Sequence, residues 1–254
     1  MKPRVLILRA PGTNCDRESA FAFERAGATA DFVHIQQLLA APETLRDYQI
    51  LCLPGGFSYG DDIAAGRILA NQIRHHLRDV LEQFKAADKL ILGICNGFQI
   101  LIKSGVLLPD AADGGLAATL TLNDSGKFED RWVQLAAVPN NNSVFLRGIE
   151  SMYLPVAHAE GKFVPRDAAT LAALQASGQV ALTYTRLDGA AGDVPYPDCP
   201  NGATAFVAGV SDETGRVFGL MPHPERHIDP TQHPRWTREP QREFGAGWPL
   251  FVNA

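Results

Sequence analysis

The first half of the chain alternates short apolar runs with stretches of helical periodicity, and this alternation limits the fold more than any other feature. It is typical of a parallel sheet with helices on both faces. The runs are apolar at nearly every position, as in strands that are buried on both sides. The expected strands and helices are Val5–Leu8, Asp31–Ile35, Gln49–Leu53 and Leu90–Ile94, and about Asp16–Ala26, Arg67–Ala87 and Asn96–Ser104. For the first helix we expect Asn14 or Asp16 as the cap and Gly27 as the stop.

The second half of the chain has a different sequence pattern from the first. From Leu116 to Leu187 β-type segments are broken by polar turns, and strands near Ala203–Val210 and Val217–Met221 close the core. A chain of 254 residues that is 46% hydrophobic can bury one large core. We therefore expect an α/β fold with an open, mostly parallel sheet in a single domain, 1–254, whose residues 226–254 form a C-terminal tail.

Charge and hydropathy exclude several classes of partner. The net charge of −5 argues against binding to a phosphate backbone, so we expect no nucleic acid partner. No stretch approaches the roughly 18 to 20 apolar residues of a membrane helix, so we expect no membrane span. The run Val5–Leu8 is too short for a signal-peptide core and ends at Arg9, which predicts a cytoplasmic protein.

The junction of one strand and one helix carries a candidate nucleophile. The sequence there reads Leu90-Ile91-Leu92-Gly93-Ile94-Cys95-Asn96-Gly97-Phe98-Gln99. A buried strand that turns directly into a helix, with glycine two residues to each side of Cys95, is the thiol counterpart of the nucleophile elbow. We expect the strand and helix backbones to approach too closely for a Cβ at Gly93 or Gly97. Cys95 is then held in a strained, exposed conformation. The positive end of the helix dipole favours its thiolate. The alternative is a core cysteine with glycine neighbours.

A second candidate group follows the last apolar strand, in Met221-Pro222-His223-Pro224-Glu225-Arg226. Residues two apart in an extended segment point the same way, and the flanking prolines keep the backbone extended. Glu225 can therefore orient His223, which then acts as a base toward a thiol. Alone, this H-x-E is more typical of a solvent-facing turn, but with Cys95 it completes a nucleophile, base and orienter.

A glycine turn follows the third strand, in Leu53-Pro54-Gly55-Gly56-Phe57. In an open α/β sheet the working crevice lies beyond the carboxyl ends of the strands. Backbone N–H groups at Gly55 and Gly56 could face a developing oxyanion there, joined by that of Asn96, although an ordinary glycine turn stays open.

Other motifs are absent or undecided. We find no zinc-deaminase spacing, no P-loop and no G-x-G-x-x-G after the first strand. We therefore expect neither a metal nor a cofactor in this chain. Cys15, Cys52, Cys95 and Cys199 form no C-x-x-C pair, so reduced thiols are expected. The pattern around His158 fits a site residue or a turn histidine.

Together these residues resemble a known family. The elbow at Cys95, the Gly55-Gly56 turn and the His223-x-Glu225 pair, in that order, are similar to class I (triad) glutamine amidotransferases. With Ala10-Pro11-Gly12-Thr13-Asn14-Cys15-Asp16 and Ala157-His158-Ala159-Glu160-Gly161, they resemble the glutaminase subunits of phosphoribosylformylglycinamidine synthases. Departures are Ala159 in place of glycine, the stretch 61–67 and a longer tail.

The resemblance implies a flavodoxin-like fold and a glutaminase. It implies that Cys95 forms a γ-glutamyl thioester, that the Gly56 and Asn96 amides hold the oxyanion, and that Gln99 and the Gly55-Gly56 turn help to hold glutamine. It further implies a large synthetase subunit, which uses ATP and magnesium to convert formylglycinamide ribonucleotide to formylglycinamidine ribonucleotide in purine biosynthesis, and a small bridging subunit.

Two alternatives remain open from the residues alone. One is a free-standing thiol hydrolase or peptidase of similar fold, which would act without a partner. The other is a non-catalytic, redox-sensing protein that uses Cys95 only as an oxidisable thiol, and it would not need His223 or Glu225.

Overall fold

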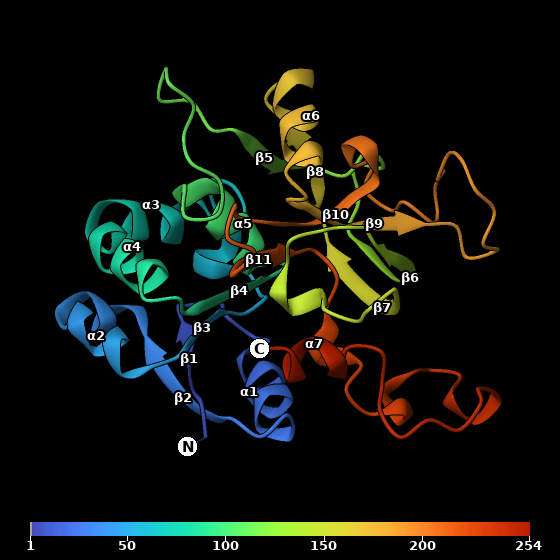
Figure 1. Ribbon diagram of the computed structural model, residues 1–254, viewed down its shortest axis with the longest axis horizontal. Coiled ribbons are helices and arrows are strands. Elements are labelled where there is room, and N and C mark those ends of the chain that lie inside the picture. Colours follow the sequence, from blue (N-terminus) through green and yellow to red (C-terminus); the bar gives the residue numbers. More distant parts are fainter. Residues whose placement is uncertain (1) are drawn as a thin grey trace.

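The computed structural model describes residues 2–254 and contains one large sheet (Figure 1). Nine strands follow the order β2-β1-β3-β4-β11-β10-β9-β6-β7, and β5 and β8 form a separate pair. The strands are β1 (Arg4–Arg9), β2 (Thr29–His34), β3 (Ile50–Leu53), β4 (Leu90–Ile94), β5 (Ala118–Thr121), β6 (Glu129–Ala137), β7 (Ser151–His158), β8 (Lys162–Pro165), β9 (Val180–Thr185), β10 (Val207–Ser211) and β11 (Val217–Leu220).

The helices are α1 (Asp16–Arg25), α2 (Ile35–Ala40), α3 (Arg67–His76), α4 (Arg78–Ala86), α5 (Asn96–Ser104), α6 (Ala168–Ala176) and α7 (Trp248–Val252). In Figure 1, α1 and α7 lie to the lower right of the parallel strands, and α3, α4 and α5 lie above them. Among residues 2–254, no helix combines the length and the apolar character that a membrane crossing requires.

The sheet has a parallel half and an antiparallel half. Strands β2, β1, β3, β4 and β11 run parallel, in the 2-1-3-4-5 order of flavodoxin-like folds. From β11 onward, β10, β9, β6 and β7 pair antiparallel and extend the sheet. The expected open α/β sheet with helices on both faces is confirmed, and the β-rich second half of the sequence supplies the antiparallel extension.

Several element boundaries differ from the expectation. The stretch 67–87 forms two helices that meet at Leu77, whose φ is −120°. Its buried stripe is continuous, so periodicity predicted one helix, but α3 packs on α5 whereas α4 packs on the 3₁₀ turn Pro42–Asp47. The break lets each half face its own neighbour.

The predicted cap of α1 is wrong. Cys15 occupies the N-cap position without a side-chain cap, and the Asn14 side chain instead accepts a hydrogen bond from the Cys15 thiol at 3.2 Å. The second strand begins at Thr29, earlier than expected, and β10 begins only at Val207.

Helix α6 was not predicted. Its N-cap Asp167 accepts a hydrogen bond from the Thr170 amide at 2.7 Å, and alanine and leucine fill its turns. An aspartate before a run of strong helix formers is the signal that could have identified it.

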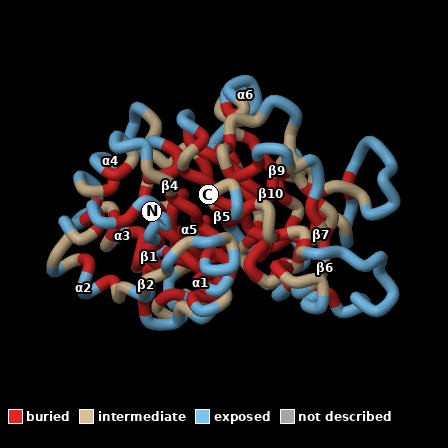
Figure 2. Tube along the Cα trace, turned by 60° about the horizontal axis from the view of Figure 1, so that its bottom comes forward, coloured by how far each residue is buried: buried red, intermediate tan, exposed pale blue. Residues whose placement is uncertain are grey.

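Helix α5 is the most deeply buried helix around the sheet. Of its nine residues only Lys103 is not fully buried, and Figure 2 shows α5 and the central strands as the buried interior. The turn from β4 into α5 brings backbones into direct contact. A Cβ at Gly97 would lie 1.9 Å from the carbonyl oxygen of Leu53, and one at Gly93 would lie 2.8 Å from the carbonyl of Gly97. The predicted need for glycine at both positions is confirmed.

We predict that Gly97→Ala lowers the free energy of unfolding by at least about 3 kcal/mol, because the clash is with backbone and no side chain can move to relieve it. Urea unfolding measures this loss. The control is Gly126→Ala, at an open turn position where a Cβ meets nothing within 4 Å and where the positive φ costs about 1 kcal/mol. Equal losses in the two variants would contradict the steric account.

Candidate active site

The loops that follow four parallel strands meet at one edge of the sheet, because carboxyl ends of parallel strands share an edge. They are residues 10–15 after β1, 54–61 after β3, Cys95 after β4 and 221–226 after β11. This edge lies at the switch point of the 2-1-3-4-5 order, where ligands bind in open α/β sheets.

Cys95 stands at the turn between β4 and α5 in a strained conformation. Its φ is 51° and its ψ is −106°, which a side-chain-bearing residue adopts only when its surroundings enforce it. Its amide donates a hydrogen bond to the Leu220 carbonyl at 2.8 Å, and its thiol donates one to the Ala157 carbonyl oxygen at 3.7 Å. The predicted strain is confirmed. The predicted exposure is wrong, since only 5% of Cys95 is exposed.

The other cysteines are poor nucleophiles. Burial raises the pKa of the thiols of Cys15, Cys52 and Cys199, and the thiolate is the reactive form. Of the four cysteines, Cys95 alone combines an elbow backbone with the N-terminal end of a helix.

His223 and Glu225 form a buried pair. Nδ1 of His223 donates to Oε1 of Glu225 at 2.6 Å, and the two side chains are 2% and 0% exposed. The His223 amide donates to the Pro155 carbonyl in β7 at 2.8 Å. The carboxylate fixes the proton on Nδ1, so Nε2 remains available as a base, as the H-x-E spacing predicted.

Nearby charges change the pKa of His223. Burial lowers the pKa of His223, but the negative charge of Glu225, together with the nearby thiols of Cys95 and Cys15, outweighs burial and raises the pKa well above its ordinary value. His223 can therefore carry a proton at neutral pH.

Gly55 lies against both catalytic candidates. A Cβ at this position would lie 2.8 Å from Cε1 of His223 and 3.5 Å from Cβ of Cys95. Gly56 has a φ of 141° and backs onto the turn at Gly12–Asn14, where a Cβ would lie 2.7 Å from the Gly12 carbonyl oxygen. The glycine turn thus forms the wall of the site, and only glycine fits there.

The side chains of Asn96 and Gln99 connect the elbow to the surrounding loops. Asn96 accepts from the Ser58 amide at 3.2 Å and donates to Gln99 Oε1 at 3.0 Å. Gln99 in turn donates to the carbonyl of Glu160 at 2.6 Å. Both side chains are buried, so they hold the loops at 58–61 and 158–161 against α5.

Two carboxylates near these amides were not predicted. Asp61 accepts from Asn96 at 3.2 Å, and the Glu160 carboxylate accepts from the Ala65 amide and lies 3.8 Å from Nζ of Lys103. Burial, assisted by the charge of Glu160, raises the pKa of Asp61. Glu160 belongs to the quoted motif Ala157–Gly161 and Asp61 to the stretch 61–67, and their place on loops after strands is the signal that could have identified them.

Cys15 is the other missed residue. Its thiol accepts from Nη2 of Arg226 at 3.2 Å, and it lies beside the His223–Glu225 pair. Only the fold reveals this, because Cys15 is about 200 residues away from both partners in the sequence.

His158 is a neutral buried histidine. Nδ1 lies 3.1 Å from Oδ1 of Asn123, and the amide nitrogen of Asn123 donates to the carbonyls of Lys127 and His158. Burial, aided by the charge of His223, lowers the pKa of His158 to about 3. Asn123 thus fixes its orientation within the loop wall.

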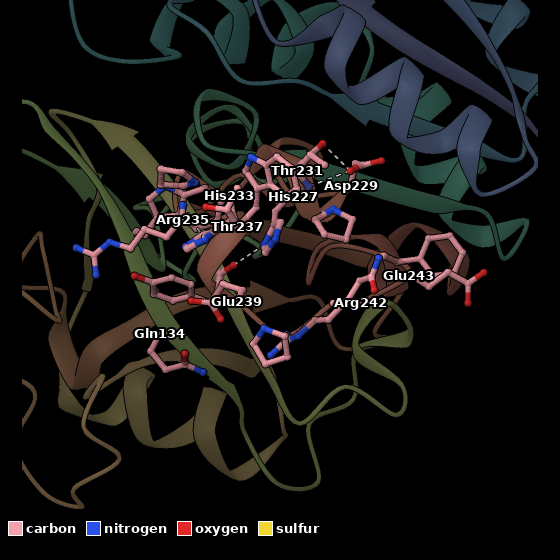
Figure 3. Close-up of a pocket in the computed structure, with 18 of the residues that line it drawn as sticks. Gln134, His227, Asp229, Thr231, His233, Arg235, Thr237, Glu239, Arg242 and Glu243 are labelled. Carbon is pink, nitrogen blue, oxygen red and sulfur yellow. Dashed lines mark hydrogen bonds between the residues drawn. The ribbon is translucent and has the colours of Figure 1, made fainter.

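A cavity of about 980 Å³ lies elsewhere, under the tail (Figure 3). Trp132 and Tyr153 form one side, and the segment 227–244 forms the other. None of the seven predicted site residues lines it. The tail packs against the rest of the protein, because Phe251 of α7 lies edge-on against Phe23 of α1 with 4.9 Å between ring centroids.

Known proteins resemble this chain over its full length. A family model described as a CobB/CobQ-like glutamine amidotransferase domain matches residues 2–254. A phosphoribosylformylglycinamidine synthase subunit PurQ of Dehalococcoides mccartyi is 48% identical, covering 100% of this chain and 96% of the relative. A relative of the same description in Treponema denticola is 41% identical, covering 90% of this chain and 89% of its own length.

Solved structures are similar to this chain as well. A chain in the structure of PurLQS from Thermotoga maritima has a TM-score of 0.73 and 34% identity, covering 100% of this chain and 97% of that chain. A putative GMP synthase subunit of Thermoplasma acidophilum, at 14% identity and a TM-score of 0.57, shares the fold, with coverage of 100% and 92%. With its elbow cysteine and its histidine–glutamate pair at one edge of a flavodoxin-like sheet, this chain belongs to the family of CobB/CobQ-like glutamine amidotransferase domains.

Proposed function

We propose that this chain is the glutaminase subunit of a phosphoribosylformylglycinamidine synthase. It hydrolyses glutamine through a thioester on Cys95 and passes the ammonia to a synthetase subunit. The observation that carries this proposal is the 2.6 Å hydrogen bond from His223 to Glu225 beside the elbow thiol. The relatives in Dehalococcoides mccartyi and Treponema denticola, which bear that enzyme's name, support the same assignment.

The first half of the reaction is acyl transfer to sulfur. The thiolate of Cys95 attacks the side-chain amide carbon of glutamine, and the carbonyl oxygen becomes an oxyanion. The backbone N–H of Asn96, in the first turn of α5, has no intrahelical acceptor and can hold this oxygen together with that of Gly56. Protonated His223 gives its proton to the departing nitrogen, so ammonia leaves and a γ-glutamyl thioester remains.

The second half is hydrolysis of the thioester. His223 is now neutral, and its Nε2 takes a proton from water, which attacks the thioester carbonyl. Glutamate leaves, and the Cys95 thiolate and protonated His223 are restored. Glu225 stabilises the charged imidazole in both halves without taking the proton itself.

Gln99 serves the substrate indirectly in this proposal. Its carboxamide is already bonded on both sides, to Asn96 and to the carbonyl of Glu160. We therefore assign it the role of holding the loop at 158–161 against the elbow, so that the site keeps the width that glutamine needs. Gly55 contributes by leaving space beside His223.

The acceptor chemistry belongs to partners. We propose a large synthetase subunit that binds ATP and magnesium and converts formylglycinamide ribonucleotide to formylglycinamidine ribonucleotide, and a small subunit that bridges the two. The likeness to a chain of the PurLQS structure supports such an assembly. This chain itself is proposed to hold no cofactor.

The alternatives are weaker. A free-standing thiol hydrolase would not explain the likeness to named synthase subunits along the whole chain, and a redox sensor would not need the His223–Glu225 bond. We place the reaction in the cytoplasm, where a reducing environment keeps the free Cys95 thiol active.

We predict that the purified chain releases glutamate from glutamine, that the synthetase with its nucleotide substrate and ATP strongly stimulates this release, and that Cys95→Ala abolishes it. Cys199→Ala, which removes another buried thiol, is the matched control and should retain activity. A coupled assay for glutamate measures both variants, with and without the partner. No glutamate under any condition would contradict the proposal.

We also predict a change in pH dependence for Glu225→Gln. Glu225 raises the pKa of His223, so without its charge the histidine loses its proton at lower pH. The alkaline limb of the profile of kcat/KM should shift to lower pH, and kcat should fall by about 100-fold or more. The control is Glu150→Gln at an exposed position, which should leave the limb in place. An unshifted limb in Glu225→Gln would show that Glu225 does not tune His223.

A further inference from the structure

A cluster of three different ligand types lies at the back of the site. The Cys15 sulfur, an imidazole nitrogen of His223 and a carboxylate oxygen of Glu225 all lie within 4.8 Å of one another, and all three residues are buried. Cys15 comes from the loop after β1, whereas the other two follow β11. The spacing in the sequence therefore contains no zinc motif, and the fold alone assembles the group.

Cys15 has no step in the proposed hydrolysis. Its sulfur accepts from Arg226 at 3.2 Å and donates to Oδ1 of Asn14 at 3.2 Å. A Cβ at Gly55 would lie 3.1 Å from this sulfur and 2.8 Å from Cε1 of His223, so the thiol and the imidazole border the same space. The thiol is thus held in place beside the catalytic pair.

The other two members of the cluster each carry a buried polar atom without a partner. Within residues 2–254, Nε2 of His223 and Oε2 of Glu225 are buried and have no hydrogen-bond partner. A buried polar atom without a partner is costly, so both atoms are available to a ligand that enters the site once His223 has lost its second proton. The missing hydrogen-bond partners are an observation independent of the short distances between the three ligand atoms.

The donor set matches one class of ion. A thiolate, an imidazole and a carboxylate together are typical of zinc, which takes ligands at about 2.0 to 2.3 Å in a tetrahedral arrangement. Ligand atoms in such a site are about 3.5 Å apart, so atoms that lie within 4.8 Å of one another need to shift by no more than about 1.3 Å. Arg226 donates from Nη2 to the Cys15 sulfur at 3.2 Å and from Nε to Glu18 at 3.1 Å, so the ion has to displace Nη2 from the sulfur, and Glu18 offsets part of the arginine charge.

We propose that Cys15, His223 and Glu225 form an inhibitory binding site for zinc or a similar thiophilic divalent cation. On binding, the Cys15 thiol and the protonated ring of His223 each release one proton to solvent, and the sulfur and one ring nitrogen become metal ligands. If the metal takes Nε2 of His223, the lone pair that acts as the base is consumed. If it takes Nδ1, the single proton of the neutral ring must sit on Nε2, and the base is lost as well.

Direct metal binding tests the site without any assay of activity. Zn²⁺ is titrated into the purified chain in competition with a chromophoric chelator, for wild type, Cys15→Ser, Cys95→Ser and Cys199→Ser. We expect Cys15→Ser to weaken the tightest site by more than about tenfold and Cys199→Ser to bind as wild type. Cys95→Ser should retain the site. Equal binding by Cys15→Ser and wild type, or loss in Cys95→Ser alone, would overturn the proposal.

Inhibition tests the consequence, which rests on the proposed glutaminase activity. Zinc should slow glutamate release by wild type, a chelator should restore it, and Cys15→Ser should need more than about tenfold more zinc for half inhibition. The ratio of rates with and without zinc is compared within each variant, so a change in basal rate does not matter. If Cys15→Ser does not fold, as judged by thermal melting, Cys15→Ala replaces it. If no glutamate is released, the proposed function is contradicted. The zinc titration then still decides whether the metal site exists.

Discussion

The candidate site depends on one steric contact, between the backbone of α5 at Gly97 and the carbonyl of Leu53 at the end of β3. This contact seats the buried helix directly on the parallel strands. Cys95 takes the strained conformation at this turn, with its sulfur beside the Ala157 carbonyl near the end of β7. The strain is maintained because α5 is buried along almost its whole length.

Both halves of the sheet hold the site. The parallel half supplies the elbow, whose Cys95 amide bonds to Leu220 of β11. The antiparallel half supplies β7, whose Pro155 carbonyl fixes the backbone of His223 and whose Ala157 carbonyl meets the thiol. Nucleophile and base are therefore set by backbone hydrogen bonds between strands, which keep them in place before any substrate arrives.

Local chemistry made part of this site predictable. The glycines on each side of Cys95 mark a sharp turn within five residues of sequence, although Gly97 is required by its contact with Leu53, and the H-x-E pair indicates an interaction between residues two apart. For the same reason the strands β3 and β4 and the helix α5 were expected close to where they lie. Signals of this kind need no knowledge of the fold.

What escaped prediction depends on contacts between distant segments. Cys15, Asp61 and Glu160 reach the site only because the sheet order brings their loops to one edge, and that order is not written in any local pattern. The break at Leu77 is similar, since it follows from what α3 and α4 pack against. Burial of Cys95 came from β7, which lies more than 50 residues further along the chain.

The measurement that tests the central claim most directly is peptide mass mapping of the enzyme after rapid acid quenching during turnover of glutamine. The account predicts a γ-glutamyl adduct on the peptide that contains Cys95 and none on those that contain Cys15, Cys52 or Cys199. An adduct on another cysteine, or steady glutamate release without an adduct at any quench time, would contradict it.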